Sequence, residues 1–100
     1  MRTFIIASSE AICSELGTRC RLVRLTRNLT QQQLADMTGA SLSSVRRFEA
    51  KGQCSLDLWV KIAHALQMVQ QLEPLFMQQA ASIAELEKQQ AAKQRQRART

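Results

Sequence analysis

The apolar residues of positions 8–78 recur every three or four residues, which is the spacing of one face of an α-helix. The pattern restarts several times, and a serine or threonine that can cap a helix precedes most of the restarts. The predicted helices begin after Ser8 or Ser9, Thr30, Ser41 and Ser55, and a short fifth helix, with Pro74 in its first turn, runs through Leu72, Leu75 and Phe76. We therefore predict an all-α fold with a five-helix bundle over residues 8–78.

The second of these helices has the most complete start signal. Thr30 is followed three residues later by Gln33, so each side chain can bond the other residue's free backbone N–H. Leu29 and Leu34 lie at the two positions that form a hydrophobic staple. Gly39 can adopt positive φ at no steric cost, and we expect the helix to end there.

The N-terminal segment, residues 1–7, is short, apolar and rich in β-branched side chains, which favours a β-type arm. A single strand cannot satisfy its own backbone hydrogen bonds, so it would need a second copy or another protein as its partner. The alternative is a flexible arm that packs loosely on the helical domain. The sequence alone leaves both possibilities open.

The C-terminal segment, residues 79–100, differs in kind from the bundle. Ser82 and Glu85 have the spacing of a capping box, so we expect a helix to start there. After Leu86 the segment has no apolar face, and from Lys88 onward it has five basic residues and no acidic one. Such a basic C-terminal helix is marginal in isolation, and a partner such as DNA or another protein would stabilise it.

The chain carries a net charge of +6, which favours a polyanionic partner such as nucleic acid or an anionic membrane surface. No apolar run approaches the roughly 20 residues of a membrane span, and the start of the chain does not resemble a signal peptide. We therefore expect a cytoplasmic protein without a membrane partner.

No arrangement of residues points to catalysis. The sequence contains no glycine-rich phosphate loop, no carboxylate pair and no nucleophile next to a base. Cys13, Cys20 and Cys54 match no metal-ligand spacing and are expected to be free thiols, and His64 has no second ligand nearby. We expect no enzyme activity, no metal and no cofactor.

Residues 29–49 carry the strongest functional signal. They read as two short helices joined by a tight turn at residues 38–40, and the second helix ends in paired arginines. This is the layout of a helix-turn-helix, whose second helix enters the major groove of DNA with its first two turns. The predicted base-reading residues are Ser41, Leu42, Ser43, Arg46 and Arg47.

Each of these side chains suits a contact with DNA. The serine hydroxyls can donate to phosphate or bond base edges, Leu42 can touch a thymine methyl group, and Arg46 or Arg47 can bind guanine through O6 and N7. At the start of the preceding helix, Gln31 and Gln32 are candidate phosphate ligands, Gln31 the better one, although a solvated helix face also explains both.

Four arginines lie in the last part of the first predicted helix: Arg19, Arg21, Arg24 and Arg27. Their charge suits the helix C-terminus, where the helix dipole favours cations. They also form a basic cluster directly before the helix-turn-helix, where phosphates would pass. The sequence is compatible with either role.

Residues 16–76 resemble the phage-repressor-like helix-turn-helix family of the Xre, or Cro/C1, type. The matching residues are Gly17, Arg19, Arg24, the run from Leu29 to Ala35, Gly39, Ser41, Ser44, Val45, Phe48, Glu49 and Gly52. The resemblance implies a homodimer that binds a two-part operator in double-stranded DNA, usually as a repressor. The family's groove-reading positions fall on Ser41, Leu42, Ser43 and Arg47, and its phosphate-binding position falls on Gln31.

The end of the chain is similar to small HipB-like regulators encoded beside HipA-type kinase toxins. This resemblance implies a repressor that autoregulates a toxin–antitoxin operon. Alternatively, it implies an antitoxin whose main role is to bind a HipA-like toxin and for which DNA binding is secondary. A third possibility, non-specific nucleic-acid binding through the basic C-terminal helix, leaves the helix-turn-helix pattern unexplained.

Overall fold

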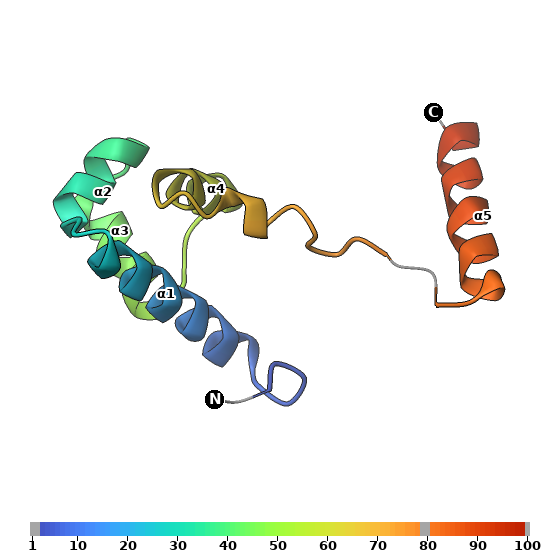
Figure 1. The fold of residues 1–100 in the computed structure, drawn as a ribbon, viewed down its shortest axis with the longest axis horizontal. Helices are drawn as coiled ribbons and strands as arrows, with labels where there is room; N and C mark the ends of the chain where they lie inside the picture. The colour runs from blue at the N-terminus through green and yellow to red at the C-terminus, as the bar shows by residue number, and fades with distance from the viewer. Residues whose placement is uncertain (1–2, 79–80, 100) are drawn as a thin grey trace.

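A computed structural model describes residues 3–78 and 81–99 of the chain. The helices are α1 (Ser9–Thr26), α2 (Gln31–Thr38), α3 (Leu42–Lys51), α4 (Leu56–Ala65), the 3₁₀ turn η1 (Val69–Gln71) and α5 (Ile83–Arg99). Helices α1 to α4 pack together, whereas α5 stands apart from them (Figure 1). The chain is thus all-helical over its described residues, as the sequence predicts.

Side chains outside the helices fix where α1 to α4 begin. The N-cap hydroxyl of each helix accepts a hydrogen bond from the backbone N–H three residues further on, and the N-caps are Ser8, Thr30, Ser41 and Ser55. At α2 the predicted capping box is complete, because Gln33 Oε1 also accepts from Thr30 N at 2.8 Å. These contacts satisfy N–H groups that the helices cannot satisfy internally.

The core lies where α2, α3 and α4 meet. Its fully enclosed apolar side chains are Leu34, Ala35, Val45, Phe48, Ile62 and Leu66. Half-buried side chains of α1 and α4, among them Val23 and Trp59, pack against this group. Burying this surface supplies the main driving force for folding in so short a chain.

Helix α1 lies unusually close to the C-terminal end of α3. A Cβ atom at Gly17 would come within 2.3 Å of the carbonyl oxygen of Phe48. At Gly52, which ends α3 with φ +68, a Cβ atom would collide with the backbone of Cys13. Only glycine permits this approach, because any larger residue at either position places an atom inside the facing backbone.

The fifth helix of the predicted bundle is not an α-helix. After α4 the chain forms η1 and then a series of turns up to Phe76, held by bonds between residues three apart such as Leu75 N to Leu72 O at 3.1 Å. Pro74 lacks an N–H and disfavours the α conformation of the residue before it. Both Gln67 and Phe76 adopt positive φ, which an α-helix excludes.

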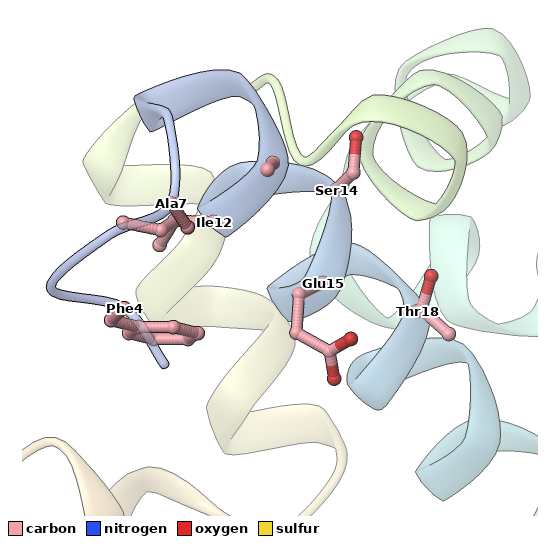
Figure 2. A pocket seen from close by; sticks show the side chains of 7 residues that line it. Phe4, Ala7, Ile12, Ser14, Glu15 and Thr18 are labelled. Atoms are coloured by element: carbon pink, nitrogen blue, oxygen red, sulfur yellow. The ribbon is translucent and has the colours of Figure 1, made fainter. Parts of the chain in front are cut away.

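The predicted N-terminal strand is also absent over the described residues. Residues 3–7 form a turn closed by Ile6 N to Thr3 O and Ala7 N to Phe4 O, both at 3.3 Å, and residues 1 and 2 lie outside the described part. The turn lies over the first half of α1, and together they line a pocket of about 360 Å³ (Figure 2). Arg19 of α1 stacks on the Phe4 ring at 5.2 Å, which ties this turn to α1.

At the C-terminal end, residues Ile83–Arg99 form α5. Ser82 Oγ accepts from Glu85 N at 3.2 Å, and Glu85 Oε2 accepts from Ala81 N at 2.8 Å. Residues 79, 80 and 100 of the predicted C-terminal segment lie outside the described part. Among the described helices, none is long and apolar enough to cross a membrane.

Candidate nucleic-acid interface

Helices α2 and α3 form the predicted helix–turn–helix geometry. Thr38 is the last residue of α2, and Gly39 turns the chain in the left-handed conformation with φ +74. Ser41 then caps α3 through a bond from Ser44 N at 3.1 Å. The two helices pack through their buried apolar side chains, so the angle between them is set by the core.

Gln31, the first residue of α2, is held against α3 by two side-chain hydrogen bonds. Its Nε2 donates to Glu49 Oε1 at 3.0 Å, and its Oε1 accepts from Arg46 Nε at 3.4 Å. These bonds bring the start of α2 next to the exposed arginine face of α3. The sequence assigns both ends of this contact to DNA binding but does not predict that they touch.

Gln32 lies in a different environment from Gln31. Its side chain is exposed and donates to Asp36 Oδ1, one turn further along α2, at 2.9 Å. Asp36 is exposed and has no ion-pair partner among the described residues, so its charge repels phosphate, whereas the Glu49 carboxylate beside Gln31 is paired with Arg24. Gln31 is therefore the better placed of the two glutamines.

The N-terminal turn of α3 carries a group of hydroxyls. Ser41 Oγ lies 3.1 Å from Ser43 Oγ and 2.8 Å from Ser44 Oγ. Ser41 and Ser43 are exposed, whereas Leu42 between them is half-buried. Ser43 can turn its hydroxyl toward a ligand, whereas Ser41 Oγ is held by its capping bond to α3 and only its proton can reorient.

Arg46 and Arg47 point outward from the middle of α3. Both are exposed, and neither forms an ion pair with any residue that the structure describes. Gln53 Oε1 accepts from Arg47 Nε at 3.0 Å and from Arg47 Nη2 at 2.7 Å. This neutral amide holds the guanidinium in place without cancelling its charge.

A buried ion pair beneath the surface was not predicted from the sequence. Arg24 donates to Glu49 through Nε at 2.6 Å and Nη2 at 3.0 Å, and its Nη1 donates to Leu29 O at 2.7 Å. The two charged side chains are only 7% and 2% exposed. The available signal was the position of Glu49, which directly follows the apolar Phe48 on the inward side of α3 and so requires a cationic partner.

Three of the four arginines at residues 19–27 make separate contacts within the chain and do not form one basic cluster. Arg24 is buried against Glu49, and Arg19 pairs with Glu15 at 2.8 Å and stacks on Phe4. Arg27 Nη1 donates to Gln67 Oε1 at 3.3 Å, toward the end of α4. Side chains at these positions point to different sides of the helix because its period is 3.6 residues.

The cysteines are free thiols, and Cys20 lies close to the buried ion pair. Burial raises the pKa of the Cys20 thiol to about 11, and the charge of Glu49 acts in the same direction. Burial also raises the pKa of Cys54. No group of three or more potential ligand residues is placed to hold a metal ion within the described ranges.

The comparison with protein families agrees with this geometry. A family model described as helix-turn-helix matches residues 21–70, which is half of the chain and includes α2, α3 and α4. A search of curated proteins gives no match.

Proposed function

Because the chain belongs to the helix-turn-helix family of the Xre, or Cro/C1, type, whose members are sequence-specific DNA-binding transcription regulators, we propose that it is a repressor. In this proposal it acts as a homodimer on a palindromic operator and autoregulates a toxin–antitoxin operon. DNA is bound by the start of α2 and the exposed face of α3.

The observation that carries this proposal is the contact between Gln31 and Arg46. Through it, the N-terminal end of α2 and the arginines of α3 form one continuous polar surface. A helix N-terminus favours an anion, because its first N–H groups are unpaired and the helix dipole is positive there. A phosphate bound at Gln31 would therefore orient α3 in the adjacent major groove.

On this surface the predicted residues divide into two roles. Gln31, with a smaller contribution from Gln32, binds the DNA backbone and fixes its position. The residues that face the base edges are Ser41, Leu42, Ser43, Arg46 and Arg47. Leu42 is half-buried, so its role is limited to apolar contact with a thymine methyl group.

Dimerisation is supported by three exposed apolar residues outside the DNA-binding surface. Leu75, Phe76 and Met77 are consecutive and exposed, and Phe76 is 100% exposed. Three adjacent apolar side chains of this size favour burial against another protein surface. In the proposed dimer, each chain presents these three residues to its partner, and each α3 reads one half of the operator.

Replacing Arg47 by Ala tests the base-reading role. We expect the change to relax discrimination at one position in each operator half, with a loss of about 1–3 kcal/mol per contact. The measurement is binding of the variant to a selected operator and to all single-base changes of that operator. Lys51→Ala is the matched control, because it removes one exposed charge from the last turn of α3.

The two variants should behave differently on specific and random DNA. Lys51→Ala should weaken binding to both by a similar factor, since a general loss of charge carries no sequence information. Equal losses on both kinds of duplex for Arg47→Ala would contradict its assignment as a base reader. Failure of the unchanged protein to bind any duplex would contradict the proposed function itself.

A second candidate function is that of an antitoxin that mainly holds a HipA-like kinase toxin. It is favoured by the N-terminal turn, where the apolar side chains of Ile5 and Ile6 are 92% and 80% exposed. Copurification of a kinase-like protein encoded next to this gene, lost on Ile5→Ser/Ile6→Ser substitution, would support this function. Full operator binding without any copurifying protein would weigh against it.

A further inference from the structure

The positive charge of the chain is concentrated at one end. Five of the fourteen basic residues and none of the eight acidic residues follow Glu87, so residues 1–87 carry a net charge of only +1. The helix-turn-helix domain is therefore nearly neutral. This is unusual for a protein that binds a polyanion, because neutralising phosphates supplies much of the affinity of most DNA-binding proteins.

Ion pairs within the domain account for part of this charge balance. Three of its bases form ion pairs within it: Arg19 with Glu15, Arg24 with Glu49, and Lys61 with Asp57. In α5, by contrast, Lys88, Lys93 and Arg95 are exposed and form no ion pair with any part of the chain that is described.

The helix dipole does not account for these bases. Its effect extends over the last turn only, which explains cations near Arg97 but not those at Lys88, Lys93 and Arg95. Lys88 and Arg95 are seven residues apart, which places them on the same side of α5 at a separation of about 10 Å along its axis. Lys88 and Arg95 therefore share one side of α5, whereas Lys93 lies about 140° around the helix from Lys88.

The composition of α5 also restricts the kind of partner it can bind. After Leu86 it has no apolar side chain larger than alanine. A helix that docks on a folded protein normally presents an apolar stripe, whereas one that binds the phosphates of DNA needs only cations. The charge and the missing apolar stripe together favour a nucleic-acid partner over a protein.

We propose that α5 is a second DNA-contacting element, which binds phosphates of the duplex outside the bases that α3 reads. The proposal rests on the proposed function, because α3 brings α5 to the DNA. Residues 72–82 connect η1 to α5, and eleven residues span at most about 40 Å. Once α3 is bound, α5 is confined near the same duplex at an effective concentration in the millimolar range.

This arrangement separates two properties of binding. The α2–α3 surface supplies sequence discrimination, and α5 supplies electrostatic affinity that is the same for every sequence. Each neutralised phosphate contributes about −0.9 to the slope of log Kobs against log salt. Three bases of α5 therefore account for a slope of about −3 per chain.

The test uses the full chain with Lys88→Gln, Lys93→Gln and Arg95→Gln combined. Glutamine keeps a similar side-chain length and helix propensity but has no charge. Binding is measured by fluorescence anisotropy, over a range of salt concentrations, on a random-sequence duplex and on a duplex selected by the protein from a random pool. Lys88→Arg with Lys93→Arg is the matched control, because it changes the residues and keeps the charge.

We expect the glutamine variant to lose about 3 units of salt slope per chain on both duplexes and to keep its discrimination between them. The arginine control should match the unchanged protein.

An unchanged salt slope with intact discrimination would overturn the role of α5 and leave the helix-turn-helix function standing. If the unchanged full chain bound neither duplex, this result would contradict the proposed DNA-binding function itself. Loss of a copurifying protein without a change in slope would identify α5 as a protein-binding helix and also overturn the proposal.

Discussion

At the scale of single residues, Glu49 connects the fold to the DNA-binding surface. Its carboxylate is almost completely buried and accepts hydrogen bonds from Arg24 and from Gln31. A buried carboxylate is stable only when its charge is balanced and its oxygens are bonded, and both conditions are met here. The side chain that packs α3 on α1 therefore also fixes the orientation of Gln31.

We predict that Glu49→Gln destabilises the protein by about 3–5 kcal/mol, because Arg24 would remain buried without a counter-charge. The measurement is the free energy of unfolding from urea denaturation followed by circular dichroism. Glu15→Gln is the control, since it breaks a more exposed ion pair with Arg19, and such pairs contribute about 1 kcal/mol or less. Similar small losses for both variants would contradict the structural role of Glu49.

The sequence could indicate the exposed residues of the interface but not the buried contact beneath it. Gln31, Arg46 and Arg47 lie at positions that a local motif defines. The partners Arg24 and Glu49 are 25 residues apart and belong to different helices, so no local spacing links them. Only the packing of α1 on α3 brings them together.

At the scale of helices, the contact between α1 and α3 depends on two glycines. Gly17 lies within α1, where its flexibility weakens the helix, yet the nearby carbonyl oxygen of Phe48 leaves no room for a side chain. Gly52 ends α3 and lies against the backbone of Cys13. The separation of the two helices is thus set by backbone contact rather than by side chains.

We predict that Gly17→Ala destabilises the protein by about 1–3 kcal/mol, although alanine favours a helix. The added methyl group would force α1 away from α3 and lengthen the bonds between Arg24 and Glu49. Thr18→Ala is the control, because Thr18 is exposed on the same helix and its change should be neutral or slightly stabilising. Thermal unfolding compares the two variants, and a higher midpoint for Gly17→Ala would refute the close contact.

Helix starts were predictable for a clear physical reason. Ser8, Thr30, Ser41 and Ser55 act on the backbone three residues away, so a local pattern contains all the information needed. The conformation of the segment after α4 was not predictable in this way. Its apolar spacing suits a helix, but Pro74 and the positive φ of Phe76 prevent one. The N-terminal segment also forms a turn and not the predicted strand; Phe4 contacts Arg19 of α1, whereas Ile5 and Ile6 stay exposed.

At the scale of the whole molecule, the hydrophobic core and most of the net positive charge lie in different parts of the chain. The helices α1 to α4 enclose the core, and α5 stands apart from them (Figure 1). The core side chains all come from residues 34–66. Stability and electrostatic affinity can therefore be changed independently.

We predict that a chain ending at Gln78 unfolds at the same urea concentration as the full chain. No side chain of α5 belongs to the core cluster, so its removal exposes none of the core. The comparison requires urea unfolding followed by the fluorescence of Trp59, which packs against the core. A lower midpoint for the shortened chain would mean that α5 packs on the domain in solution.

The contact of Arg24, Glu49 and Gln31 also has an evolutionary consequence. A buried ion pair can often be replaced by apolar residues of similar volume without loss of stability, so folding alone would permit such an exchange here. The exchange would remove the acceptor that orients Gln31. Selection for regulation of target genes would then preserve a pair that selection for stability does not require, and the three positions should change together among descendants of this protein.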